Sequence, residues 1–168
     1  HENPSGQTSR LCHDDLTIIT PSRLVARSLG RSHQSLQTLA VRHLERGGWA
    51  IASLLKAQAL FRQALQQTVQ PVDLLGTAKA WLPTVRSLLQ SCPDLAQVSG
   101  DVSGRTAQLL QVGLTFQQML KRERLVDLSE LYWQALEQAI APEKLLIYGY
   151  FQPRRDELAW INRLAAAD

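Results

Sequence analysis

Two short segments contain residue types found in metal-dependent nuclease motifs, but neither segment has the arrangement that hydrolysis requires. A metal-dependent nuclease needs carboxylates and a lysine at neighbouring strand positions, where they hold a metal ion and activate water. Pro93-Asp94 falls in a segment that reads as a loop, and Glu143-Lys144 lacks the spacer of a Glu-x-Lys pair. The sequence therefore predicts no catalytic residue of this class.

Histidine and cysteine, the other common metal ligands, are few and scattered. The histidines at positions 1, 13, 33 and 43 form no H-E-x-x-H pattern. Cys12 and Cys92 are far apart, and neither belongs to a C-x-x-C pair. We expect no metal site and no disulfide, and reduced thiols are typical of a cytoplasmic protein.

Nucleotide-binding loops are missing from the sequence as well. No Gly-Lys dipeptide occurs, which excludes the loop G-x-x-x-x-G-K-[ST] that holds nucleotide phosphates. There is also no G-x-G-x-x-G loop for dinucleotides after a predicted strand. The G-x-S-x-G turn that carries the nucleophile of serine hydrolases is absent as well. We therefore expect no cofactor, and by its own residues this chain is not recognisable as an enzyme.

The net charge of +3 is modest, but the cations are concentrated in one segment. Residues 21–62 contain seven Lys or Arg and one acid, Glu45. Such a segment attracts phosphate through counterion release, and it can equally be the solvated face of helices. No apolar run approaches the ~20 residues of a membrane-spanning helix, and the polar first residues do not resemble a signal peptide. We expect no membrane association.

Two short apolar runs predict β-strands near the two ends of the chain. The first covers residues 16–20 and is stopped by Pro21, and the second covers residues 145–148 and ends at Gly149. Between them, apolar residues recur at three-and-four spacing, which predicts helices. The predicted helices cover residues 22–29, 36–46, 49–67, 72–89, 106–122 and 127–140, and His33–Leu36 reads as a very short strand or a helix cap.

Local signals add detail to these elements. Pro83 should break or kink its helix, and residues 91–104 read as a loop. Asp127 followed by Glu130 has the pattern of a capping box. A last helix should have Pro153 at its first position, Asp156 and Glu157 in its first turn and a buried stripe of three residues. The stripe comprises Leu158, Ile161 and Leu164, and Trp49, Trp81 and Trp133 are expected in cores rather than stacked on bases.

These elements predict an α/β fold that is predominantly helical, with a small parallel sheet and a large helical insert. We expect a flexible arm at residues 1–15, an α/β core at 16–40 and 141–168, and the insert at 41–140. The first residue is His1 rather than Met, which suggests a piece of a longer protein.

The closing segment, residues 145–168, resembles the second motif of UvrD/Rep-type superfamily 1 DNA helicases. In that family a buried strand leads into Asp-Glu-Phe-Gln-Asp, and an amphipathic helix and Gly-Asp follow. Here Phe151 and Gln152 keep the Phe-Gln, while Gly149 and Tyr150 replace the Asp-Glu; Trp160, Leu164 and Asp168 match the helix and the final Asp. The resemblance implies a partial, P-loop NTPase-like core whose ATPase is inactive. The family's Asp helps to hold Mg²⁺ and its Glu orients water, and neither Gly nor a phenol with a pKa of about 10 can replace them.

Two further segments are similar to the same family. Residues 122–136 resemble the helix that precedes the second motif, and residues 18–23 resemble the strand and loop of the motif that contacts single-stranded DNA. Residues 32–40 are weakly similar to a neighbouring Thr-Phe-His-Ser-Leu-Ala segment. The Gly-Tyr variant is most like the inactivated helicase subunit of AddAB-type helicase-nucleases, which keeps the helicase shape to hold DNA and its partner subunit.

The resemblance implies a non-catalytic DNA-binding and scaffolding domain of a DNA repair or recombination helicase-nuclease. The implied partners are single-stranded DNA, bound without sequence preference, and a helicase subunit. The residues expected to contact phosphate are Ser22, Arg23, His33, Ser35, Arg154 and Arg155. Two alternatives remain open: a fragment of an active ATP-dependent helicase with its phosphate loop upstream, and a helical protein–protein interaction module.

Overall fold

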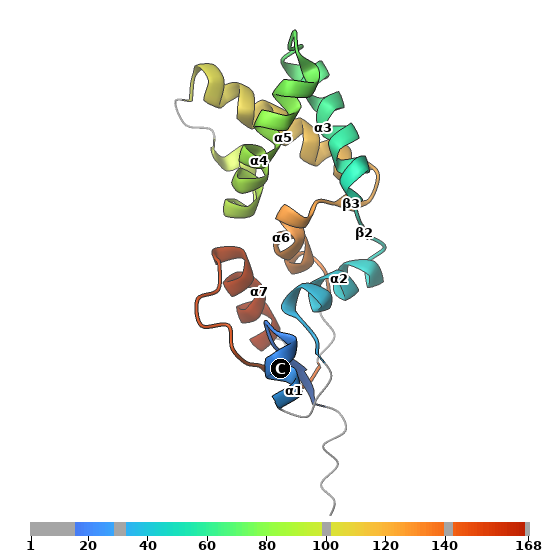
Figure 1. The fold of residues 1–168 in the computed structure, drawn as a ribbon, viewed down its shortest axis with the longest axis vertical. Helices are drawn as coiled ribbons and strands as arrows, with labels where there is room; N and C mark the ends of the chain where they lie inside the picture. The colour runs from blue at the N-terminus through green and yellow to red at the C-terminus, as the bar shows by residue number, and fades with distance from the viewer. Residues whose placement is uncertain (1–15, 29–32, 99–101, 140–142, 167–168) are drawn as a thin grey trace, which may run out of the picture.

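The computed structural model describes residues 16–28, 33–98, 102–139 and 143–166. Helices dominate, and they form two groups along the long axis of the molecule. Figure 1 places α3, α4 and α5 at one end, α1 and α7 at the other, and α2 and α6 between them. The predicted arm at residues 1–15 lies outside the described residues.

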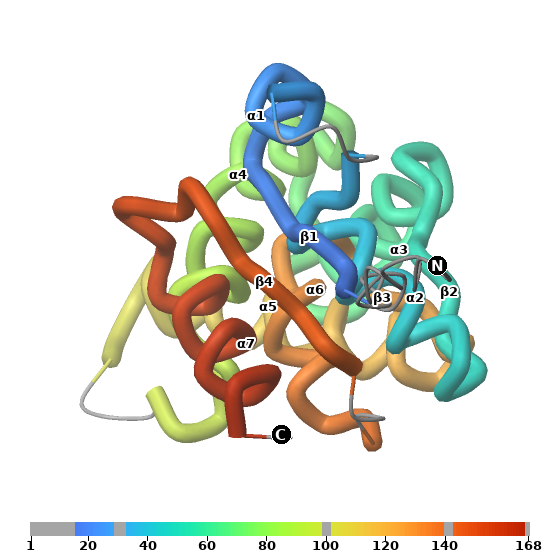
Figure 2. The backbone as a smooth tube through the Cα atoms, turned by 90° about the horizontal axis from the view of Figure 1, so that it is seen from below, coloured from blue at the N-terminus to red at the C-terminus, as the bar shows by residue number. Residues whose placement is uncertain are grey.

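The parallel sheet joins the two predicted strands. β1 (Thr17–Ile19) pairs with β4 (Leu145–Ile147), and Thr17 lies opposite Leu145. Figure 2 shows the two strands side by side. On its other side, Ile19 forms a parallel bridge with Gln34, whose carbonyl accepts from the Thr20 N–H at 2.9 Å. Of the two alternatives expected at residues 33–36, the helix cap is confirmed at Ser35, and Gln34 forms a single bridge rather than a strand.

A second parallel pair corrects the prediction of one continuous helix over residues 49–67. β2 (Ala50–Ile51) pairs with β3 (Leu125–Val126), and helix α3 begins only at Leu54. The Ala50 N–H donates to the Arg124 carbonyl at 3.0 Å, and the Ala52 N–H donates to Val126 at 2.9 Å. The pair holds the residues before α3 beside the residues that follow α5 (Gly104–Arg122).

Three long helices form the first hydrophobic core. They are α3 (Leu54–Thr68), α4 (Leu74–Ser91) and α5 (Gly104–Arg122), and Phe61 and Phe116 meet edge to face at its centre. Ser53 and Asp73 cap α3 and α4 with their side-chain oxygens. Helix α4 continues through Pro83, so the chain does not break there.

The second hydrophobic core covers the sheet. Helices α2 (Leu36–Arg46), α6 (Leu131–Leu136) and α7 (Arg155–Ala165) pack around fully buried Trp160. Short helix α1 (Arg23–Ser28) follows β1. The fold is therefore α/β and predominantly helical with a small parallel sheet, as predicted. The boundaries at 41 and 140 stay predictions, although α2 and α6 pack with the sheet and the first core spans Ala52 to Leu120.

Several local predictions need correction. The predicted loop at 91–104 contains a short 3₁₀ helix, η1 (Leu95–Val98). Asp127 caps a second 3₁₀ helix, η2 (Leu128–Glu130), but the Glu130 carboxylate accepts from the Gln117 side-chain amide instead of completing a capping box. The helix that follows η2, α6, ends at Leu136, before the predicted end at residue 140.

The final helix also begins later than predicted. Its cap is Arg154 and it begins at Arg155, so Pro153 precedes the helix instead of occupying its first position. Asp156 and Glu157 do lie in the first turn, and Glu157 accepts from the Arg154 N–H at 2.9 Å. Leu158 is exposed, and the buried positions are Asp156, Trp160 and Leu164.

Candidate functional site

The parallel strands end at one edge of the sheet, and the predicted site residues begin there. Thr20–Arg23 follow β1 and Tyr148–Tyr150 follow β4, while Ser35, the cap of α2, follows Gln34. The Tyr148 N–H donates to the Ile19 carbonyl at 2.9 Å, which holds the two exits together. In open α/β sheets, ligands bind outside the carboxyl ends of the strands. We call this region the carboxyl edge.

Gly149 fits this edge because it has no side chain. Its φ is +90°, a region that residues with a Cβ rarely adopt. A Cβ built there would lie 3.1 Å from Cδ and 3.3 Å from Cγ of the Pro21 ring. An aspartate at this position would therefore be strained and would press on the neighbouring loop, so the present backbone is built for glycine.

Tyr150 has a structural partner on another element. Its hydroxyl oxygen accepts a hydrogen bond from the Leu36 backbone N–H at 3.0 Å. Leu36 is the first residue of α2, where amides have no partner within the helix. Burial raises the pKa of the Tyr150 phenol above its usual value, so the group stays neutral. Position 150 thus caps a helix and provides no carboxylate that could act as a base.

Ser22 and Ser35 are helix caps as well. The Ser22 hydroxyl accepts from the Val25 N–H at 3.3 Å, and the Ser35 hydroxyl accepts from the Thr38 N–H at 3.0 Å. The Ser22 hydroxyl still has its own hydrogen to donate, whereas the Ser35 hydroxyl also lies 2.9 Å from the Thr38 hydroxyl oxygen, where either group can be the donor. Both side chains are half-buried at the carboxyl edge, so contact with a phosphate oxygen is compatible with their structural role.

Arg23 is exposed on α1, and the structure adds a second cation to it. Arg27 lies one helical turn later, so the two arginines share a face of α1. Both are exposed, and neither has an ion pair with an acid within residues 16–28, 33–98, 102–139 and 143–166. His33 is also exposed. The four-residue spacing of Arg23 and Arg27 in the sequence would have indicated that both lie on one face of a helix.

The other predicted arginines differ from each other. Arg154 is bound by Asp156 through Nε at 3.1 Å and by Glu157 through Nη2 at 3.3 Å, and its guanidinium lies 5.9 Å from the centre of the Tyr132 ring. These contacts turn it toward α6, where it lines a cavity of about 340 Å³ with Arg86. Arg155 is exposed and has no ion pair within the described part of the chain.

Two exposed aromatic rings at the carboxyl edge were missed by the sequence analysis. Tyr148 exposes 51% of its surface and Phe151 exposes 85%, and their ring centres are 6.5 Å apart. Of the three tryptophans that we expected in cores, Trp81 and Trp133 are each at least nine-tenths buried, whereas Trp49 is only partly buried beside the second core. Gln152 is exposed beside Phe151. A strand-like run normally buries its aromatics, which is why this pair was not singled out.

Within the part of the chain that the structure describes, no group of three or more His, Cys, Asp or Glu side chains could hold a metal ion. No described helix is both long enough and apolar enough to cross a membrane. Compared with known proteins, the sequence matches no protein-family model and no curated protein.

Proposed function

We propose that this chain is a non-catalytic, helicase-like domain that binds single-stranded DNA at the carboxyl edge and serves as a scaffold in a DNA repair helicase-nuclease. The observation that carries the proposal is the exposed pair Tyr148 and Phe151 at the same edge as Arg23. Proteins that bind single strands without sequence preference combine cations for the backbone with aromatic rings on which bases stack.

The cations at this edge suit phosphate contacts. Arg23 and Arg27 are exposed one turn apart on α1, Ser22 directly precedes this helix, and Ser35 follows Gln34, which bridges to β1. Arginine and hydroxyl contacts to phosphate position a strand without reading its bases. Binding of this kind should weaken steeply as the salt concentration rises.

The loop after β4 supports the proposal that this domain is not catalytic. Gly149 has a backbone suited to glycine, and Tyr150 caps α2, so both replacements have become part of the packing. The pairing of β1 with β4 also fits the resemblance, which needs residues 16–20 beside residues 145–150. The scaffolding role and the helicase partner subunit rest on the resemblance to inactivated AddAB-type subunits.

The test is a titration of fluorescein-labelled oligothymidine, followed by fluorescence anisotropy at several salt concentrations. Phe151→Ala should weaken binding about tenfold, because the stacking of one base is worth roughly 1–3 kcal/mol. Arg23→Ala should weaken binding and reduce the salt slope by about one.

Matched controls keep the result specific. Leu128→Ala removes an apolar side chain that is 53% exposed on η2, and Arg163→Ala removes an exposed cation from α7. Both should bind DNA like the parent. Absence of binding at low salt, or equal loss in the controls and the site variants, would overturn the proposal and favour a protein–protein interaction module.

A further inference from the structure

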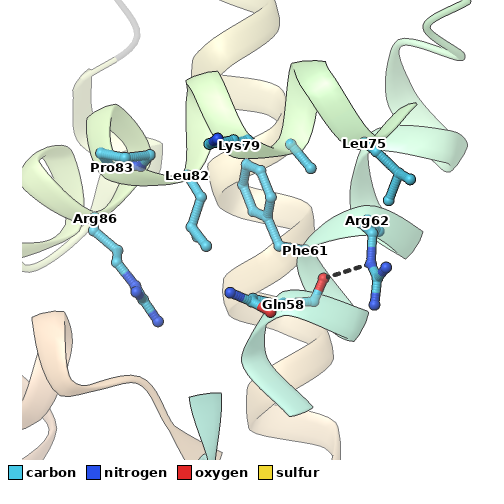
Figure 3. A pocket seen from close by; sticks show the side chains of 9 residues that line it. Gln58, Phe61, Arg62, Leu75, Lys79, Leu82, Pro83 and Arg86 are labelled. Carbon is cyan, nitrogen blue, oxygen red and sulfur yellow. Dashed lines mark hydrogen bonds between the residues drawn. The ribbon is translucent and has the colours of Figure 1, made fainter. Parts of the chain in front are cut away.

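A groove between α3 and α4 lies at the end of the molecule away from α1. It has a volume of about 460 Å³, which is within the size range of ligand sites. Figure 3 shows Phe61 of α3 reaching toward α4, which contributes Leu75, Lys79 and Leu82, while the Arg62 side chain runs along α3 to the Gln58 carbonyl. The helices are joined by a short connection, residues 69–73, so the groove is a fixed feature of this helix pair.

The floor of the groove is apolar and its wall is accessible. Phe61 is fully buried and Leu82 is 8% exposed, so they form the base. Leu75 is 64% exposed along the wall, and Pro83 continues the apolar lining toward the other end. An exposed leucine beside an apolar base offers a seat for an aliphatic or aromatic side chain of a ligand.

The charges around this floor are all positive. Arg62, Lys79 and Arg86 line the groove, and no lining residue is an acid. Arg86 already binds Asp127 at 2.7 Å. Arg62 donates to the Gln58 carbonyl, and no ion pair joins Arg62 or Lys79 to an acid within the described ranges. Two cations flanking an apolar floor are therefore left for a ligand.

We propose that this groove binds an acidic peptide segment of a partner protein, in which carboxylates flank one or two apolar side chains. Carboxylates form charge-assisted hydrogen bonds with arginine and lysine. Nucleic acid fits the lining less well, because the one aromatic ring, Phe61, is fully buried and offers no face for stacking. The site is separate from the carboxyl edge and extends the proposed function with a second binding surface.

The experiment is a selection of peptides from a random displayed library on the full chain, with counter-selection on Lys79→Glu. Selected peptides are then titrated against purified variants by fluorescence anisotropy. We expect sequences in which Asp or Glu flank Leu, Ile or Phe. Lys79→Glu and Arg62→Glu should each weaken binding about tenfold, and this loss should shrink at high salt.

Leucine variants separate the apolar contact from the charges. Leu75→Ser should weaken binding at all salt concentrations, whereas Leu55→Ser, at a site on α3 that is 78% exposed and outside the groove, should bind like the parent. Both residues are exposed, so both variants should fold, and circular dichroism checks this.

Three results of the peptide selection and titration would overturn the proposal. They are a selection that yields no binder, binders without acidic residues, and binders that keep their affinity for Lys79→Glu and Leu75→Ser. Displacement of the peptide by oligothymidine would also overturn it, because nucleic acid would then be the occupant. Arg23→Ala should leave peptide binding unchanged, so failure of the DNA proposal and failure of this one are distinguishable.

Discussion

The Tyr150 hydroxyl accepts a hydrogen bond at 3.0 Å from the backbone N–H of Leu36, a residue 114 positions earlier in the chain. The bond joins the loop after β4 to the first turn of α2 at the carboxyl edge. In the helicases that the sequence resembles, this position has a carboxylate that acts on water. Here the Tyr150 side chain stabilises the arrangement of two elements, so position 150 has a packing role.

The first prediction concerns that bond. Tyr150→Phe should lower the free energy of unfolding by about 1 kcal/mol, because the Leu36 amide loses its acceptor while the ring stays in place. Urea unfolding followed by circular dichroism measures the change. Tyr148→Phe is the control, since Tyr148 is half exposed and no hydrogen bond of its hydroxyl is seen in the described part of the chain. An equal effect in both variants would contradict the role of the bond.

The second prediction concerns Gly149. Gly149→Ala should destabilise the fold by roughly 1–3 kcal/mol, because alanine is strained at φ +90° and its Cβ meets the Pro21 ring. Gly48→Ala is a matched control: φ is +76° there, but no atom lies within 4 Å of the added carbon. We expect Gly48→Ala to cost less, as measured by the same urea titration. A larger cost at Gly48 would show that the contact with Pro21 is unimportant.

Local signals predicted the sheet well but predicted the junctions between elements poorly. Residues 16–20 and 145–148 combine apolar residues with a Pro or Gly stop, and both contain strands. β2 and β3 contain two residues each, too few for a period, and their pairing joins residues 75 positions apart, such as Ala50 and Leu125. Glu130 matches a capping-box pattern, yet burial beside Gln117 decides its partner. Contacts of this kind are set by tertiary packing, which a local pattern does not contain.

The third prediction uses Glu130, which lies between α5 and α6. Burial raises the pKa of this carboxyl from 4.5 to about 7, with the Gln117 hydrogen bond opposing the rise. The folded state therefore holds a proton that the unfolded state releases, and stability falls as pH rises from about 4.5 through 7. The loss is on the order of 3 kcal/mol at most.

Glu130→Gln removes this loss, because a neutral amide of the same shape has no charge to bury. The free energies of unfolding of parent and variant should be closest near pH 4.5 and should diverge toward pH 8, with the variant more stable. Burial lowers the pKa of His43, so this residue destabilises the fold as pH falls below 6.5; comparison at equal pH cancels its effect. Parallel pH profiles would refute the assignment to Glu130.

The fourth prediction concerns the link between α4 and η2. Arg86 binds Asp127 through two nitrogens, and the Asp127 side chain is 2% exposed. Arg86→Met keeps most of the apolar stem but leaves a buried carboxylate whose remaining partner among the described residues is Ser129, so it should cost about 3 kcal/mol. Arg46→Met breaks the more exposed pair with Glu143 and should cost under about 1 kcal/mol. If the double variant Arg86→Met with Asp127→Asn is no more stable than Arg86→Met alone, the unpaired carboxylate is not the source of the loss.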